Sequence, residues 1–180
     1  MKFFEKFNSQ QLLYIAILAA LGLATKPIIT PLVHLISTPL MVPGGSLAGG
    51  FYMMWLVLAA ALVKKPGAAF LVGFVQSIAV LSLGYFGNHG FVSVISYSLP
   101  GLAVEIVAFF WKNKTDLFFH VFSCILSNIT GAIVVTIVIM RLAFIPLMIS
   151  LVAASISGIV GGIISYKILK KLITYDLVRN

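Results

Sequence analysis

One carboxylate lies within an apolar stretch, in the sequence SYSLPGLAVEIVAFFW that runs over residues 96–111. An ionised carboxylate is costly to bury in an apolar environment, so Glu105 is expected either to face a polar cavity or to be neutral. Tyr97, Gly101 and Glu105 follow one another at intervals of four residues and therefore share one face of a helix. With Gly101 leaving space between the two polar side chains, this pattern predicts a ligand between the phenol and the carboxylate. Glu105 would favour a ligand that is cationic or rich in hydrogen-bond donors.

Glu105 can alternatively have a structural role without contacting a ligand. The carboxylate can pair with Arg141 or Lys112, or it can be a neutral acid bonded to a neighbouring helix. Arg141 is expected at the opposite end of the membrane. Lys112 lies about 10 Å further along the helix, near a boundary where its side chain can extend into water. The ligand interpretation is therefore favoured.

Other polar side chains lie in apolar segments too. Asn128 accompanies a stripe of small residues formed by Ser123, Ser127 and Gly131, and Gln76 lies in another apolar run. Such stripes commonly indicate close helix packing, so Asn128 and Gln76 can alternatively serve as hydrogen-bonding partners between helices. The predicted substrate-binding residues are Glu105, Tyr97, Asn128, Gln76, His89 and Asn88.

Motifs of the common catalytic and cofactor sites are absent from the sequence. No glycine is followed by lysine, which excludes a P-loop. There is no H-E-x-x-H or G-x-S-x-G motif, and no Cys/His cluster with metal-ligand spacing. Asp116 and Asp176 fall at the edges of apolar segments, which argues against an aspartyl intramembrane protease. We therefore predict no enzymatic activity, no catalytic residue, no metal site and no cofactor.

The composition is that of an integral membrane protein. Of 180 residues, 61% are hydrophobic and 9% are charged, more apolar surface than a soluble domain of this length can bury. We predict an all-α membrane protein in the plasma membrane, with residues 1–180 forming one domain. The net charge of +8 does not indicate nucleic-acid binding, because the basic residues form small groups between apolar runs. Anionic lipid headgroups, or acidic surfaces on a cytoplasmic partner, are the better partners for them.

Six segments are predicted to span the membrane, each approaching the roughly 20 residues that a spanning helix needs. They are residues 11–27, 47–63, 67–83, 91–111, 117–140 and 144–169. With six spans, ten basic residues fall on one side and only Lys26 and Arg141 fall on the other. Because positive charge concentrates on the cytoplasmic side, both termini are predicted to be cytoplasmic.

The connection between the first two segments, KPIITPLVHLISTPLMVPGGS, is long and apolar. It contains four prolines, and Lys26 and His34 are its only basic side chains. One interpretation is a long loop that packs on the outer mouth of the bundle as a lid or a partly inserted segment. The other is a proline-containing continuation of the first helix.

The first helix also carries a ridge of small side chains. Ala16, Ala20 and Ala24 recur every four residues, so they form a smooth strip on which another helix can lie closely. This strip, called the alanine ridge below, either packs within the bundle or docks on a partner.

These features together resemble the substrate-binding S components of energy-coupling factor (ECF) vitamin transporters. The shared features are six helices in under 200 residues, the alanine ridge and the long apolar connection. The loop KKPGAA (residues 64–69) and the sequence PGLAVEIV (residues 100–107) are most similar to the YkoE-type S components for thiamine or its hydroxymethylpyrimidine precursor. The resemblance implies capture of a vitamin from outside, docking through the alanine ridge on a membrane scaffold subunit that two cytoplasmic ATPases drive, and release inside.

Two alternatives stay open at this level. One is an S component for a different vitamin. The other is a small secondary transporter or channel that works alone. Against the second, the sequence shows no inverted repeat and no intramembrane charge besides Glu105 for ion coupling.

Overall fold

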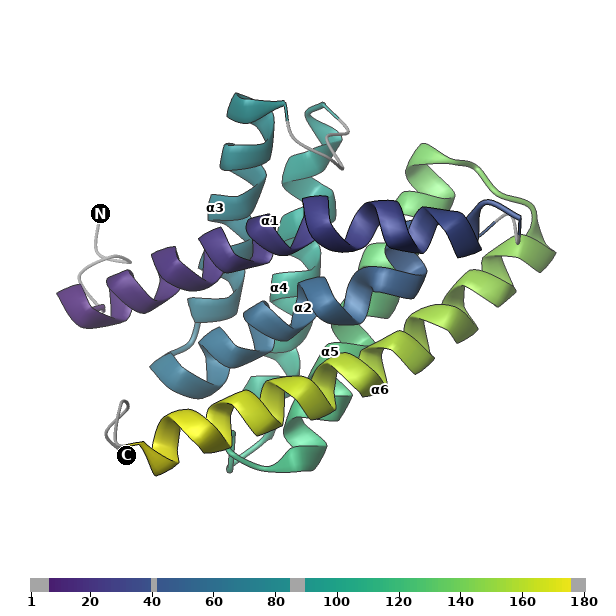
Figure 1. The fold of residues 1–180 in the computed structure, drawn as a ribbon. Helices are drawn as coiled ribbons and strands as arrows, with labels where there is room; N and C mark the ends of the chain where they lie inside the picture. The colour runs from purple at the N-terminus through teal and green to yellow at the C-terminus, as the bar shows by residue number, and fades with distance from the viewer. Residues whose placement is uncertain (1–6, 40–41, 85–89, 176–180) are drawn as a thin grey trace.

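The structure, a computed structural model, describes residues 7–39, 42–84 and 90–175, and its regular elements there are helices (Figure 1). They are α1 (Ser9–Ser37), α2 (Gly44–Val63), α3 (Ala68–Leu83), α4 (Val92–Phe110), α5 (Leu117–Ile133), the π-helix η2 (Val134–Ile139) and α6 (Phe144–Thr174). The all-α prediction is confirmed. Most predicted boundaries lie close to the observed ones, and the end of the first segment is the main difference.

The first helix continues ten residues beyond its predicted end at Pro27. It begins with a capping box, in which the Asn8 side chain accepts a hydrogen bond from the Gln11 N–H (2.8 Å) and the Gln11 side chain accepts one from the Asn8 N–H (3.1 Å). Pro27 and Pro31 both lie inside α1. They are four residues apart, so their missing N–H groups fall on one face, which membrane helices tolerate. The long-loop prediction is therefore wrong, and the interpretation as a continued helix is confirmed.

Five of the described helices are long and apolar enough to cross a membrane. The exception is α3, whose 16 residues extend for roughly 24 Å at 1.5 Å per residue. In Figure 1, α1, α2 and α6 run across the view, while α3 and α4 rise past them. Large apolar side chains are exposed along the bundle, among them Leu35, Phe109 and Ile156, as expected for a surface in contact with lipid.

Small residues allow α2 to lie directly against α6. A Cβ atom added to Gly50 would lie 1.8 Å from the Ser157 carbonyl oxygen, and one added to Gly161 would lie 2.1 Å from the Gly50 carbonyl oxygen. The Gly50 N–H also donates to the Ser157 hydroxyl (2.9 Å). Gly158 and Gly162 also lie against the α5 backbone, where added Cβ atoms would be 2.6 Å from the Ile125 Cα and 2.5 Å from the Val121 Cα. For α6, these small residues therefore serve helix packing.

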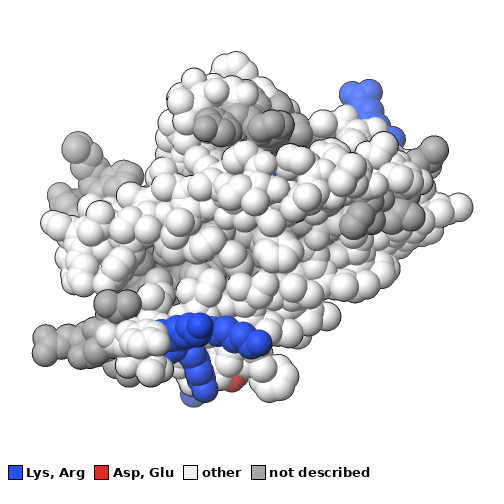
Figure 2. Space-filling model, viewed as in Figure 1, with Lys and Arg blue, Asp and Glu red and all other residues white. Residues whose placement is uncertain are grey.

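On the face that Figure 2 shows, the exposed charged residues lie toward the ends of the bundle. The start of α1 and the end of α6 lie on the same side in Figure 1. Figure 2 shows basic side chains gathered near the end of α6, a separate basic group at the opposite edge, and a nearly uncharged surface between them. This distribution agrees with the charge asymmetry of the sequence, on which the prediction of cytoplasmic termini depends.

Candidate substrate cavity

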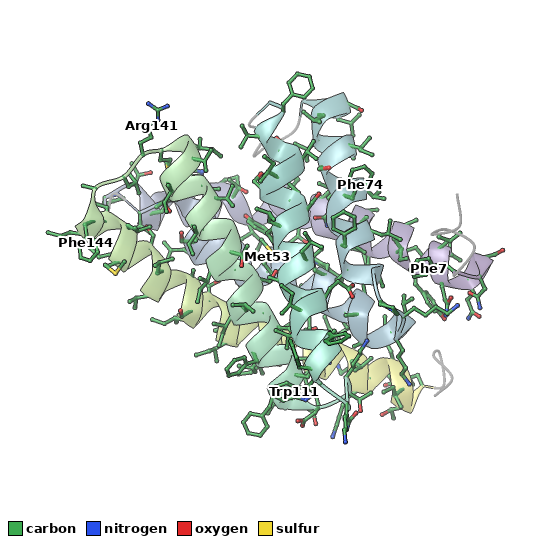
Figure 3. The ribbon with its side chains drawn as sticks, turned by 180° about the vertical axis from the view of Figure 1, so that it is seen from behind. Phe7, Met53, Phe74, Trp111, Arg141 and Phe144 are labelled. Carbon is green, nitrogen blue, oxygen red and sulfur yellow. The ribbon has the colours of Figure 1, made fainter. Side chains whose placement is uncertain are left out.

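A cavity of about 330 Å³ lies near the ends of the helices where α1 finishes and α2 begins. This volume is at the lower end of the range for small-molecule sites. Met53 of α2 lines the cavity, and Figure 3 shows it near the middle of the bundle, between Arg141 and Trp111 at opposite ends. The polar side chains in its wall come from α1 to α5 and are Lys26, Thr30, His34, Ser46, Tyr52, Gln76, Ser96, Tyr97 and Asn128.

Lys26 is the cationic group among the described residues of the wall. Its ammonium donates a hydrogen bond to the Tyr97 hydroxyl and lies 3.7 Å from the centre of the Tyr97 ring. The centre of the Tyr52 ring is 5.3 Å away. The Tyr52 hydroxyl is in turn 2.9 Å from the Thr30 hydroxyl. The aromatic faces attract the ammonium, so a partly buried cation is held between two phenols.

The two predicted amide residues line the cavity and also bridge helices. The Asn128 side-chain nitrogen donates to the carbonyl oxygens of Ala154 (2.8 Å) and Ser46 (3.3 Å), and thereby joins α5 to α6 and α2. The Gln76 side-chain nitrogen donates to the Ala19 carbonyl oxygen in α1 (3.3 Å). Their oxygen atoms can still accept hydrogen bonds, so an inter-helix role and a ligand-contacting role are compatible.

Glu105 lies outside this cavity. Its Oε1 accepts a hydrogen bond from the Ala69 N–H (2.7 Å) in the first turn of α3, where backbone N–H groups lack helical partners. The carboxylate borders a separate open groove together with Gly67 and Lys114. It therefore caps α3, which explains how a carboxylate is accommodated in this apolar sequence.

The predicted pocket between Tyr97 and Glu105 is not formed. The two residues share a helix face but are eight positions apart, or about 12 Å along the axis. The space that Gly101 leaves between them is filled by α3, because a Cβ atom at Gly101 would lie 2.7 Å from the Ala69 carbonyl oxygen. Of the other predicted binding residues, Asn88 and His89 lie outside the described residues.

Sequence reasoning missed Lys26, Thr30 and His34 as members of one site. They are spaced four residues apart, so they share one face of α1, and that face lines the cavity. This pattern was present in the sequence, but it is visible only if the proline-containing segment is read as helix. The argument that Glu105 is the only charge inside the membrane is also wrong, because Lys26 lies within the α1 span.

The start of α2 forms another part of the cavity wall. Gly44, Gly45 and Ser46 all line the cavity, and no side chain caps the first turn, which follows Pro43. A Cβ atom added to Gly45 would meet no atom within 4 Å. The N-terminal end of a helix has partial positive charge, so this wall favours negative charge in the cavity.

The alanine ridge is on the outside of the described bundle. Ala16, Ala20 and Ala24 are exposed, whereas Ile15 and Leu18 on the other side of α1 are buried. The alanine ridge is therefore not covered by another helix of the described bundle.

Residues 10–134, more than half of the chain, match the sequence model of a family described as ABC-type cobalt transport system, permease component. No curated protein and no solved structure gives a significant match to the chain. The matched segment runs from the first turn of α1 to the first residue of η2 and so contains most of the cavity wall. The chain belongs to this family and is a multi-pass plasma-membrane component of an ABC-type transport system of the ECF class.

Proposed function

We propose that the chain is the substrate-binding S component of its transport system. The observation that carries this proposal is the cavity, in which polar side chains from several helices converge within an otherwise apolar bundle. Its volume suits a molecule of the size of a small vitamin. The S component would capture the molecule from outside and deliver it inside together with a scaffold subunit and two ATPases, without catalysis by this chain.

The alanine ridge supports docking on a scaffold subunit. It lies on α1 and is exposed, and its small side chains let a second helix approach closely. Bulk at the ridge would block this approach, while the cavity side chains would stay where they are.

The family description names cobalt, but the donor atoms of the cavity favour an organic substrate. His34 is the single imidazole in the described wall, and the wall contains an ammonium but no described carboxylate or thiol. Cobalt ions are bound by imidazole, carboxylate or thiolate groups, and Lys26 would repel them. Across the described residues, no three His, Cys, Asp or Glu side chains lie close enough together to hold a metal ion.

The preference for thiamine or hydroxymethylpyrimidine depended on Glu105 facing the ligand. Because Glu105 borders another groove and Lys26 lines the cavity, the support for a cationic ligand such as thiamine is weakened. Thiamine therefore enters the experiments as one test compound among others.

Two measurements test the proposed function. Mass spectrometry of the purified protein, after incubation with a mixture of water-soluble vitamins, should detect one bound small molecule. Ala20→Trp should abolish uptake by the assembled transporter but leave this binding intact. The control is Ile156→Trp, which places the same tryptophan side chain at an exposed site of α6. If Ala20→Trp assembles and transports like the control, the ridge is not the docking surface.

A second candidate, a carrier that works alone, is favoured by one observation. Lys26 is an intramembrane charge next to the cavity, of the kind that can couple transport to ion movement. The two candidates differ in a simple way. An S component accumulates substrate only when scaffold and ATPase subunits are present with ATP, whereas a carrier accumulates it in vesicles that contain this chain alone.

A further inference from the structure

We infer that the substrate is a small organic acid whose carboxylate binds to Lys26. This inference rests on the proposed substrate-binding function and specifies the chemical class of the molecule. Three features of the cavity carry it: the environment of the ammonium, the start of α2, and the positions of the acidic side chains.

The Lys26 ammonium contacts only neutral groups among the described residues that surround it. It has three N–H donors, and the Tyr97 hydroxyl takes one of them. The rings of Tyr97 and Tyr52 attract the charge but carry no net negative charge themselves. Removing an ammonium from water without a counter-ion is costly even when burial is partial, and a ligand carboxylate would supply both the opposite charge and acceptors for the other two N–H groups.

The start of α2 adds a second source of positive potential to the same cavity. This first turn has no side-chain cap, and two of its residues, Gly44 and Gly45, line the wall. Ser46 follows them, and its buried hydroxyl has no hydrogen-bond partner within the described structure. Helix N-termini bind anions through their backbone N–H groups, so this wall and Lys26 favour the same kind of ligand.

The acidic side chains that the structure describes lie away from Lys26. Glu105 accepts a hydrogen bond from Ala69 and borders the other groove, and Asp116 precedes the first residue of α5. The remaining two, Glu5 and Asp176, lie outside the described residues. A carboxylate, with one negative charge, matches the single charge of Lys26, whereas a phosphate monoester would bring close to two. This difference in charge favours a carboxylate.

If the inference is right, binding requires both the carboxylate of the ligand and the ammonium of Lys26. The purified protein is incubated with matched pairs in which a carboxylate is replaced by a neutral group: nicotinate and nicotinamide, biotin and biotinamide, pantothenate and panthenol. Thiamine and an extract of water-soluble metabolites complete the set. Native mass spectrometry identifies any bound species, and titration calorimetry gives its affinity. We expect the bound species to carry a free carboxylate, and its methyl ester to bind at least roughly tenfold more weakly.

Lys26→Met keeps most of the aliphatic length but removes the charge. It should weaken binding roughly ten- to hundredfold, as expected for loss of a charge-assisted hydrogen bond. Arg141→Gln is the matched control, because Arg141 is exposed and does not line the cavity. This control should keep the wild-type affinity. Circular dichroism and size-exclusion profiles like those of the wild type establish that each variant is folded.

The possible outcomes distinguish a failure of this inference from a failure of the proposed function. A bound molecule without a carboxylate, including thiamine or a phosphate ester, overturns the inference but keeps the substrate-binding function. Unchanged ligand affinity in the folded Lys26→Met variant also overturns the inference and keeps the substrate-binding function. If no molecule from any source binds the wild-type protein, the proposed function fails and the inference fails with it.

Discussion

The close contact between α2 and α6 predicts that a single methyl group at Gly161 destabilises the protein. In Gly161→Ala the new Cβ atom would lie 2.1 Å from the Gly50 carbonyl oxygen, and an ordinary contact needs at least 3.4 Å. The two helices would have to separate by about 1.3 Å. Overpacking of this kind costs about 1–3 kcal/mol. The higher helix propensity of alanine offsets about 0.5–1 kcal/mol of that cost.

These two terms leave a net loss of roughly 0–2.5 kcal/mol for Gly161→Ala. Because the atoms that the methyl group meets belong to the Gly50 backbone and cannot rotate away, a loss of about 1–2 kcal/mol is expected. For a chain of this length, each kcal/mol corresponds to roughly 2–4 °C in the melting temperature, so a decrease of about 2–8 °C is expected. The assay is thermal unfolding in detergent without ligand, followed by size-exclusion chromatography of the remaining monomer.

Gly45→Ala is the matched control because it makes the same substitution in α2 where nothing lies within 4 Å of the new methyl group. Its melting temperature should equal or slightly exceed that of the wild type. The packing argument is refuted if Gly161→Ala is as stable as Gly45→Ala.

Three further predictions test orientation, Glu105 and α1. In intact cells, a membrane-impermeant thiol reagent should label a cysteine at His89 but not one at Lys65, because the charge asymmetry predicts that position 89 is outside and position 65 is cytoplasmic. The native Cys124 is buried and should add no background; labelling at Lys65 alone would reverse the orientation. Glu105→Gln should change ligand affinity less than about twofold, since the side chain caps the Ala69 N–H outside the cavity; calorimetry showing a tenfold loss would return Glu105 to the binding site. Pro31→Ala should leave helicity by circular dichroism unchanged, because the surrounding residues are already helical; a gain of helix would mean that the segment is a loop in solution.

The sequence predicted those parts of the fold that depend on local pattern. The lengths of the apolar runs and the turn residues beside them predicted α2, α3 and α4. Pro43, Lys65-Pro66 and Gly90 lie in the segments that precede these three helices. The same reasoning ended the first helix too early at Pro27. A proline inside a helix is destabilising in water, but within a membrane bundle the alternative of unpaired backbone groups in lipid is worse.

The location of the site depended on distances that no local pattern contains. Helical periodicity correctly placed Tyr97 and Glu105 on one face of α4, but it could not show that the backbone of α3 lies against Gly101 between them. Conversely, Lys26 and Tyr97 are far apart in sequence, and their contact results from α1 packing in the bundle beside α2 and α3. Packing between helices therefore decides which polar residues meet.

One helix carries both of the features that a transport subunit of this class would need. Lys26 is in the wall of the cavity, and Ala24 belongs to the exposed ridge. Two residues along an α-helix correspond to a rotation of about 200°, so these side chains point to nearly opposite sides of α1. Ala20, six residues before Lys26, lies about 120° around the helix from it. A substrate and a scaffold helix would therefore contact different sides of α1, and substitutions at Lys26 and at Ala20 should separate substrate binding from assembly.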